Sequence, residues 1–240
     1  MEFQGKTAIV TGASAGIGRA TAIKFAEEGA NLVLVDIDGE KLKAVEESVR
    51  ALGANVLSFS CDIADEESVK NVVATAIERF GKVEILVNNA GIWRCWQPFV
   101  EMPSEHWKRY IDVNILGTMY FAHEVLPDML KHGYGRIINL GSVAGVYGNA
   151  NMADYSMTKG AVIAFTKALA KEVADKGITV NCVSPGSVSH TDGTEPSELA
   201  FMGRTGSHRE NAELICFLAS DRAAYISAQN YQIDGCRKKQ

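Results

Sequence analysis

The sequence lacks the features that mark several classes of protein. Its net charge is −5, and the basic run at residues 237–239 is too short for a nucleic-acid footprint. Its five cysteines form no CxxC pair, which argues against a zinc site or a disulfide framework and favours a reducing compartment. No apolar run reaches membrane-spanning length, and the first six residues lack the apolar core of a signal peptide. We therefore expect a soluble cytoplasmic protein that binds no metal, nucleic acid or membrane.

The chain does contain a regular alternation of short apolar runs and amphipathic stretches. Of its 240 residues, 47% are apolar and 22% are charged, which is an ordinary globular composition. We expect strands over residues 7–11, 31–36, 54–60, 84–88, 136–140, 178–183 and 230–234. We expect helices over residues 16–28, 39–52, 66–80, 104 to about 131, 154–176 and 209–220.

These runs predict the fold class. The expected strands are continuously apolar, which is typical of a parallel sheet covered by helices on both faces. We therefore predict a single α/β domain over residues 1–240, built on a doubly wound Rossmann-type parallel sheet of about seven strands. The exception to regularity is residues 184–206, rich in Gly, Ser, Thr and Pro. A loop of that length is usually functional or mobile, so we expect a mobile substrate loop there.

A glycine-rich turn joins the first expected strand to the first expected helix. Residues 11–18 read Thr-Gly-Ala-Ser-Ala-Gly-Ile-Gly. Such glycines let the backbone turn tightly and approach a diphosphate, while the helix N-terminus offers free N–H groups and a positive dipole end. A glycine pattern alone is also compatible with a flexible turn. Because a strand precedes it and a helix follows it, we expect a dinucleotide site.

Asp36, at the end of the second expected strand, bears on the choice of dinucleotide. An acidic residue at this point can bind both hydroxyls of the adenosine ribose and would repel a 2′-phosphate. Ala15 and Ile37 stand where a basic residue would receive that phosphate. We therefore predict NAD(H) over NADP(H). The alternative is that Asp36 only caps the following turn.

Tyr155 and Lys159 are four residues apart and therefore lie on one face of a helix. A nearby ammonium lowers the pKa of a phenol, and such a phenol can exchange a proton with an alcohol or carbonyl oxygen. Ser142, thirteen residues before Tyr155, is a candidate to hold that oxygen. Alone, the YxxxK pattern is also compatible with a solvated helix face.

Together these motifs resemble those of the short-chain dehydrogenase/reductase family. TGxxxGIG at 11–18, Asn-Asn-Ala-Gly at 88–91, Ser142, YxxxK at 155–159 and Pro-Gly at 185–186 occur in family order over nearly the whole chain. The resemblance implies an NAD(H)-dependent oxidoreductase that interconverts a secondary alcohol and a ketone. It also implies these cofactor-binding residues: Gly12, Ser14, Gly16, Ile17, Gly18, Asp36, Asp62, Ile63, Asn89, Ala90, Gly91, Tyr155, Lys159, Pro185, Gly186 and Val188.

The resemblance implies roles for four catalytic residues as well. Tyr155 would be the acid/base, and Ser142 would stabilise charge on the substrate oxygen. Lys159 would also bind the nicotinamide ribose, and Asn114 would hold a proton-relay water. Two alternatives stay open: Asn114 bonds backbone within its own helix, and Asp62 is a turn residue at the end of a strand.

The substrate side carries weaker signals. His190 stands where many family members have a threonine, and the 184–206 segment is shorter than usual. Trp93 and Trp96 suit a bulky or ring-containing substrate, although core or interface packing is an equal alternative. Tyr147 and His190 are further candidate substrate contacts. A hydroxysteroid or other ring alcohol is therefore favoured over a sugar or polyol, then a 3-oxoacyl thioester, with a non-catalytic nucleotide-binding regulator as a rival. The resemblance also implies a homotetramer or homodimer.

Overall fold

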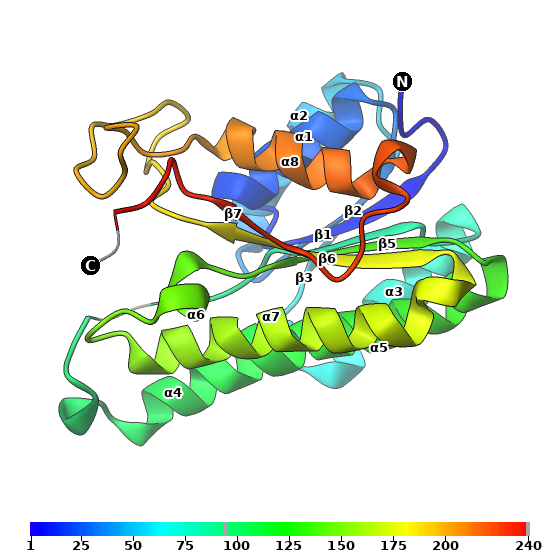
Figure 1. Ribbon diagram of the computed structural model, residues 1–240. Helices are drawn as coiled ribbons and strands as arrows, with labels where there is room; N and C mark the ends of the chain where they lie inside the picture. The colour runs from blue at the N-terminus through cyan, green and yellow to red at the C-terminus, as the bar shows by residue number, and fades with distance from the viewer. Residues whose placement is uncertain (94–95, 239–240) are drawn as a thin grey trace.

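The computed structural model describes residues 1–93 and 96–238, in which seven parallel strands form one sheet between two layers of helices (Figure 1). The sheet order is β3-β2-β1-β4-β5-β6-β7. The strands are β1 (Thr7–Thr11), β2 (Asn31–Asp36), β3 (Val56–Ser60), β4 (Ile85–Asn88), β5 (Gly135–Leu140), β6 (Ile178–Pro185) and β7 (Asn230–Ile233). The α-helices are α1 (Gly16–Glu27), α2 (Gly39–Ala51), α3 (Glu66–Phe80), α4 (Ser104–Tyr110), α5 (Thr118–His132), α6 (Val143–Tyr147), α7 (Ala153–Val173) and α8 (His208–Ala219). The predicted doubly wound fold is confirmed.

Both faces of the sheet are buried because consecutive strand residues point to opposite sides. In β2, Leu32 and Leu34 pack into a core with α1, α2 and α8, while Val33 and Val35 pack into the opposite core with α3, α5 and α7. Figure 1 shows the same division, with α1, α2 and α8 above the sheet and α3, α5 and α7 below it. The continuous apolar runs of the sequence follow from this double burial.

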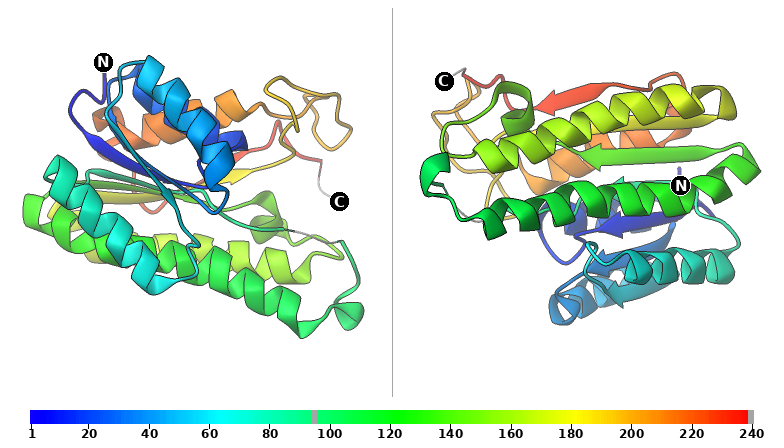
Figure 2. Two further views of the ribbon diagram at one scale, coloured as in Figure 1. Left: turned by 180° about the vertical axis from the view of Figure 1, so that it is seen from behind. Right: turned by 90° about the horizontal axis from the view of Figure 1, so that it is seen from below.

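The prediction of one regular helix from residue 104 to about residue 131 was wrong. It divides into α4, a π-helical segment (Ile111–Gly117) and α5, which form one long run beside α7 (Figure 2, right). A π segment holds an extra residue per turn, often occurs at functional sites, and gives no pattern of apolar spacing that would reveal it. The short helix α6 was also not predicted. Three 3₁₀ turns occur in the described parts of the chain, at Phe99–Glu101, Ala174–Lys176 and Asp221–Ala223.

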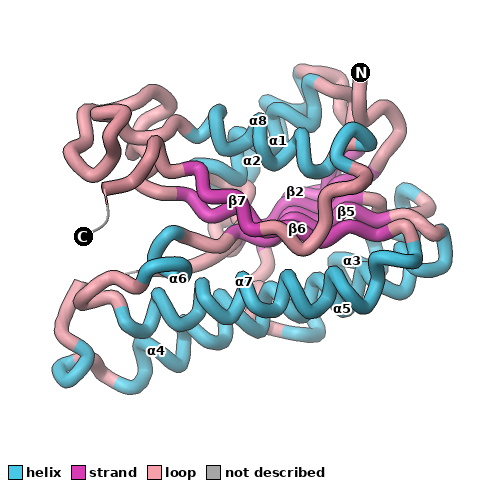
Figure 3. The backbone as a smooth tube through the Cα atoms, in the orientation of Figure 1, coloured by secondary structure: helices cyan, strands magenta, loops and turns pink. Residues whose placement is uncertain are grey.

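The carboxyl ends of the strands gather the predicted site residues at one edge. Because all strand pairs are parallel, the segments that follow β1, β4, β5 and β6 leave the sheet on the same side. The segments after β4 and β6 are the long ones, and Figure 3 shows long loops at the left edge of the sheet. Ligands bind at this edge in open α/β sheets, where the strand order reverses.

None of the helices in the described ranges is long and apolar enough to cross a bilayer.

Candidate active site

The glycine-rich turn has a backbone that only glycine fits. Gly12 and Gly16 have positive φ values of 64° and 56°. A Cβ built on Gly18 would lie 2.0 Å from the Gly12 carbonyl oxygen, so the turn and α1 pack too closely for any side chain. Within the described residues, no side chain caps the start of α1 at Ala15. The first N–H groups of α1 are therefore left for an anionic ligand, as a dinucleotide diphosphate requires.

Asp36 lies beside this turn and makes the capping contacts considered for it, while its role toward a ribose stays a prediction. Its Oδ2 accepts a hydrogen bond from the Ser14 N–H (3.0 Å), and its Oδ1 accepts one from the Asp38 N–H (2.9 Å). Asp36 therefore caps the following turn, and it also lines a cavity of about 160 Å³ at the end of β2. We call this space the adenosine-side cavity; its walls include Gly12, Asp36, Ile37, Cys61, Asp62, Ile63, Ala90, Gly91, Ile92, Arg109 and Val113.

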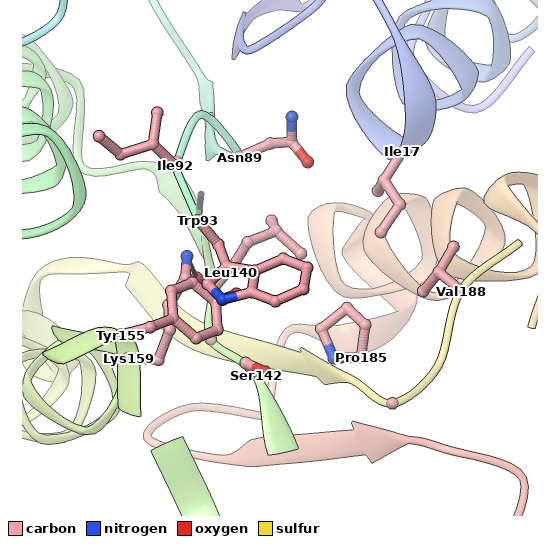
Figure 4. Close-up of a pocket in the computed structure, with 13 residues that line it drawn as sticks. Ile17, Asn89, Ile92, Trp93, Leu140, Ser142, Tyr155, Lys159, Pro185 and Val188 are labelled. Carbon is pink, nitrogen blue, oxygen red and sulfur yellow. Dashed lines mark hydrogen bonds between the residues drawn. The ribbon is translucent and has the colours of Figure 1, made fainter. Parts of the chain in front are cut away.

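A second cavity, of about 240 Å³, lies further along the same edge (Figure 4). Its walls are Ile17, Asn89, Gly91, Ile92, Trp93, Leu140, Gly141, Ser142, Tyr155, Lys159, Pro185, Gly186 and Val188. We call it the reaction-side cavity. The two cavities share Gly91 and Ile92 in their walls and therefore lie side by side. That a dinucleotide lies across both, with its adenosine half near Asp36 and its other half near Tyr155, stays a prediction.

Ser142 and Tyr155 meet in the reaction-side cavity. Ser142 starts α6, and its Oγ accepts a hydrogen bond from the Ala144 N–H (3.1 Å). Both side chains line the cavity. Burial raises the pKa of Tyr155 above its ordinary value, and the neighbouring Ser142 side chain opposes this rise. The prediction of a lowered tyrosine pKa was therefore wrong.

Lys159 explains this difference. Its Nζ donates a hydrogen bond to the Leu140 carbonyl oxygen (2.7 Å) and lies 5.9 Å from the centre of the Tyr155 ring. The ammonium thus faces a backbone carbonyl at the end of β5 rather than the phenolic oxygen. Burial also lowers the pKa of Lys159 itself to about 8. The positive charge that the prediction relied on is therefore itself disfavoured by the site.

Asn114 is fully buried in the π-helical segment and does not bond to its own helix backbone through its side chain. Its Oδ1 accepts from the Ile92 N–H (2.7 Å), and its Nδ2 donates to the Ile92 carbonyl (3.0 Å) and to Thr158 Oγ1 (3.1 Å). The alternative of a bond within its helix was wrong. A Cβ built on Gly91 would lie 3.2 Å from both Asn114 Oδ1 and Lys159 Nζ, so the glycine lets these two polar groups converge.

Several residues that hold this arrangement were missed from the sequence. Thr11 Oγ1 accepts hydrogen bonds from the N–H groups of Asn89 and Ala90, each at 3.0 Å, and so ties β1 to the segment after β4. Thr158 supports Asn114, and Arg109 pairs with Asp62. Each contact joins segments far apart in the chain. Of these missed residues, Thr158 is the one that a local signal could have revealed, because it lies inside the YxxxK motif.

The four candidate substrate residues are not brought together. Trp93 lines the reaction-side cavity, with its ring centre 6.4 Å from that of Tyr155 (Figure 4). Trp96 packs edge-on against Trp93 at 6.4 Å but does not line the cavity. Tyr147 makes its hydrogen bond to Gln232, and His190 is exposed with its N–H bound to Glu195. Of these four residues, Trp93 is the one that lines the reaction-side cavity, and its contact with a substrate stays a prediction.

The 184–206 segment is folded back by backbone contacts. β6 extends through Pro185, two residues beyond its predicted end, and bridges join Val188 to Gly206 and Pro196 to Arg204. At the outer part of this loop, Asp192 forms an ion pair with Arg19 of α1 (2.6 Å). The loop therefore reaches the helix that begins at the glycine-rich turn. Its mobility stays a prediction.

Comparisons with known proteins agree with the geometry. The profile of the family described as short chain dehydrogenase matches residues 6–200. A 3-oxoacyl-(acyl-carrier-protein) reductase of Thermotoga maritima is 38% identical, over 98% of this chain and 98% of that protein. Cyclohexanol dehydrogenase of an Acinetobacter species is 36% identical, over 98% of this chain and 95% of its own length. The solved structure of NAD⁺-bound xylitol dehydrogenase superposes with a TM-score of 0.93 at 34% identity, covering 98% of this chain and 100% of that one.

Proposed function

Because this chain belongs to the short-chain dehydrogenase family and is an oxidoreductase of CH–OH groups, we propose that it interconverts a secondary alcohol and its ketone with NAD(H). The observation that carries the proposal is the convergence of Ser142, Tyr155 and Lys159 in a cavity continuous with the glycine-rich turn. When bound, the nicotinamide supplies or takes up the hydride.

The protein's own side chains handle the proton and the charge on the substrate oxygen. Tyr155 donates its phenolic proton to the oxygen in reduction and accepts one in oxidation. The Ser142 Oγ accepts from Ala144, which fixes the hydroxyl so that its hydrogen can point to the same oxygen. Because burial raises the pKa of Tyr155, the phenol is held protonated before ligands bind, ready to act as the acid.

Lys159 and Asn114 complete the proposed path for that proton. Lys159 is anchored on Leu140, where its ammonium can bind ribose hydroxyls and favour the phenolate once Tyr155 has lost its proton. Asn114 is fixed by Ile92 and Thr158 at the inner end of the path. A chain from Tyr155 through Lys159 toward Asn114 would let the proton leave the buried cavity.

We propose NAD(H) rather than NADP(H) on the placement of Asp36. Its carboxylate lines the adenosine-side cavity at the end of β2, where it can accept from ribose hydroxyls and would repel a 2′-phosphate. Binding of both dinucleotides should be measured for the wild type and for Asp36→Ala. Wild type should prefer NAD, and Asp36→Ala should reduce that preference by roughly ten-fold or more. Tighter binding of NADP by the wild type would contradict this assignment.

For the substrate, we propose a ring alcohol or ring ketone. The support is the Trp93 ring beside Tyr155, which offers an apolar face to a substrate ring at the reacting carbon. The similarity to cyclohexanol dehydrogenase points the same way. A 3-oxoacyl thioester is the second candidate, favoured by the similarity to the reductase of Thermotoga maritima. A polyol is the third, because of the similarity to xylitol dehydrogenase.

The test follows the absorbance of the reduced nicotinamide while the protein is offered cyclic, steroid, polyol and 3-hydroxyacyl alcohols. Turnover of ring alcohols with NAD supports the proposal. Preferred turnover of 3-oxoacyl thioesters or of polyols would replace the ring substrate with that class. Binding of NAD without turnover of any of them would favour a nucleotide-binding regulator.

We also propose a homodimer or homotetramer assembled through α5 and α7. Between these helices lies an open groove of about 390 Å³ bordered by Leu116, Met119, Tyr120 and Phe165. An apolar groove of this kind on two long helices suits a second copy of the chain. Light scattering at micromolar concentration should give at least a dimer, and a monomer would count against the proposal.

A further inference from the structure

Arg109 lies in the wall of the adenosine-side cavity. It lies on α4, and its Nη2 donates a hydrogen bond to Asp62 Oδ2 at 2.7 Å. Both side chains are 38% exposed, so the pair stands at the cavity wall rather than in the core. The two residues are 47 positions apart in the chain, and the contact joins α4 to the turn that follows β3.

The Asp62 carboxylate is held at both of its oxygens. Asp62 Oδ2 accepts from Arg109, and Oδ1 accepts from the Ala64 N–H (3.1 Å). Burial alone would raise the pKa of Asp62, but the Ala64 N–H and Arg109 together bring it below its ordinary value. A carboxylate oxygen can accept more than one hydrogen bond, so both oxygens keep acceptor capacity toward the cavity. Asp62 is thus an ionised acceptor with a fixed orientation.

We infer that Arg109 is a positioning residue that orients Asp62 to accept the exocyclic amino group of adenine, and so sets the base preference of the dinucleotide site. The inference rests on the proposed function, since it needs the adenosine half of a dinucleotide in this cavity. The 6-amino group of adenine donates hydrogen bonds, whereas the 6-oxo group of hypoxanthine only accepts them. A fixed carboxylate therefore favours adenine and repels hypoxanthine.

Another role for a cation in this cavity would be to receive a 2′-phosphate. The structure favours adenine recognition for two reasons. The charge of Arg109 is already balanced by Asp62 at 2.7 Å, and Asp36 in the same cavity adds a second negative charge. A phosphate would have to displace Asp62 from Arg109 and lie near Asp36, and both changes oppose its binding.

The experiment compares NAD with nicotinamide hypoxanthine dinucleotide, which differs from NAD at the base alone. Dissociation constants are measured by calorimetry for the wild type, Arg109→Met, Arg109→Lys and the control Arg50→Met. Arg50 suits the control because it forms a similar surface ion pair with Glu46 (2.7 Å) on α2. Arg109→Met should weaken NAD binding about ten-fold and bring the ratio of the two dissociation constants close to one. Arg109→Lys should keep part of the ratio, and Arg50→Met should leave it unchanged.

Asp62→Asn supplies a second, independent readout. An amide can donate to the 6-oxo group, so this variant should bind the hypoxanthine dinucleotide relatively better than the wild type does. A wild type that prefers NAD while Arg109→Met keeps the full preference would overturn the inference and leave the proposed function intact. Loss of NADP binding alone in Arg109→Met would also overturn it, in favour of a phosphate role. If the wild type binds neither dinucleotide, the proposed function itself fails, and the inference with it.

Discussion

The inner and outer sides of the reaction-side cavity differ in how they are held. On the inner side, Asn114 and Lys159 are buried, and each is fixed by hydrogen bonds to backbone. On the outer side, Trp93 and Trp96 are 49% and 60% exposed and meet mainly through their rings. Buried polar groups must find partners within the protein, so their geometry exists before any ligand arrives. The comparison supports the proposal that the inner side determines the reaction, while the outer side determines the substrate.

The largest effect should come from removing the Tyr155 hydroxyl. Tyr155→Phe keeps the ring beside Trp93 but loses the group that exchanges a proton, so turnover should fall by about 10²–10⁴-fold. NAD binding, measured by calorimetry, should stay within a few-fold of the wild type. Tyr147→Phe is the matched control, because the Tyr147 hydroxyl bonds to Gln232 outside the cavity lining. Turnover of Tyr155→Phe within a few-fold of the wild type would remove the proposed acid/base role.

Burial of Lys159 should lower the stability of the folded protein by an amount that depends on pH. Burial lowers the pKa of Lys159 from 10.5 to about 8, so the charged form is disfavoured in the folded state. Below pH 8 the lysine is protonated in both states and the full cost applies, about 3 kcal/mol by the size of the shift. Between pH 8 and 10.5 the unfolded state binds more protons, so stability rises with pH until the cost is gone.

Thermal melting from pH 7 to pH 10 measures this cost. Lys159→Met should be more stable than the wild type at pH 7, and the difference should shrink as the pH rises above 8. Lys171→Met, at an exposed position of the same helix, should show no such convergence. If the difference in stability between Lys159→Met and the wild type stays constant across this range, burial does not disfavour the charged form of Lys159.

The sequence predicted the fold and the site well wherever local signals exist. The bounds of β2 and α3 agree with the prediction, because a doubly buried strand reads as an apolar run and α3 shows clear amphipathic spacing. Gly12 and Gly18 were predicted from the glycine pattern, and their tight packing in the structure excludes a side chain at either position. Ser142, Tyr155 and Lys159 were brought to one cavity, as the motif spacing indicated.

Features that depend on distant partners could not be predicted. The raised pKa of Tyr155 comes from burial, and spacing along a helix says nothing about how deeply a phenol lies. The bond of Lys159 to the Leu140 carbonyl and the pairing of Arg109 with Asp62 both join separate elements. On the outer side, Tyr147 and His190 were predicted from their place near the motifs. Tyr147 ends the short helix α6 and His190 lies on an exposed loop, and position in the sequence does not determine where either side chain points.

A smaller effect should come from the outer wall. With a ring substrate, Trp93→Ala should raise KM about three- to ten-fold, because the ring contact at the cavity is lost. Its kcat should change little, since the inner side chains are untouched. Trp96→Ala should have a weaker effect, because Trp96 does not line the cavity and packs edge-on against Trp93. A fall in kcat for Trp93→Ala without a change in KM would contradict the proposal that the outer side acts on substrate binding and the inner side on the reaction.

The smallest effect should come from the ion pair that links the outer loop to α1. Asp192 bonds to Arg19 at 2.6 Å, and His208 Nδ1 lies 3.5 Å from Asp192. Both Asp192 and Arg19 are exposed, so the pair contributes little, and Asp192→Asn should speed NADH release only about two- to three-fold in stopped-flow fluorescence. At about 1 M salt, where charges are screened beyond about 3 Å, the difference should disappear. The charge-swapped pair Arg19→Asp with Asp192→Arg should restore slow release. An Asp192→Asn effect that persists in high salt would instead mean that the carboxylate holds the loop through its hydrogen bonds, and that the outer side is as tightly fixed as the inner one.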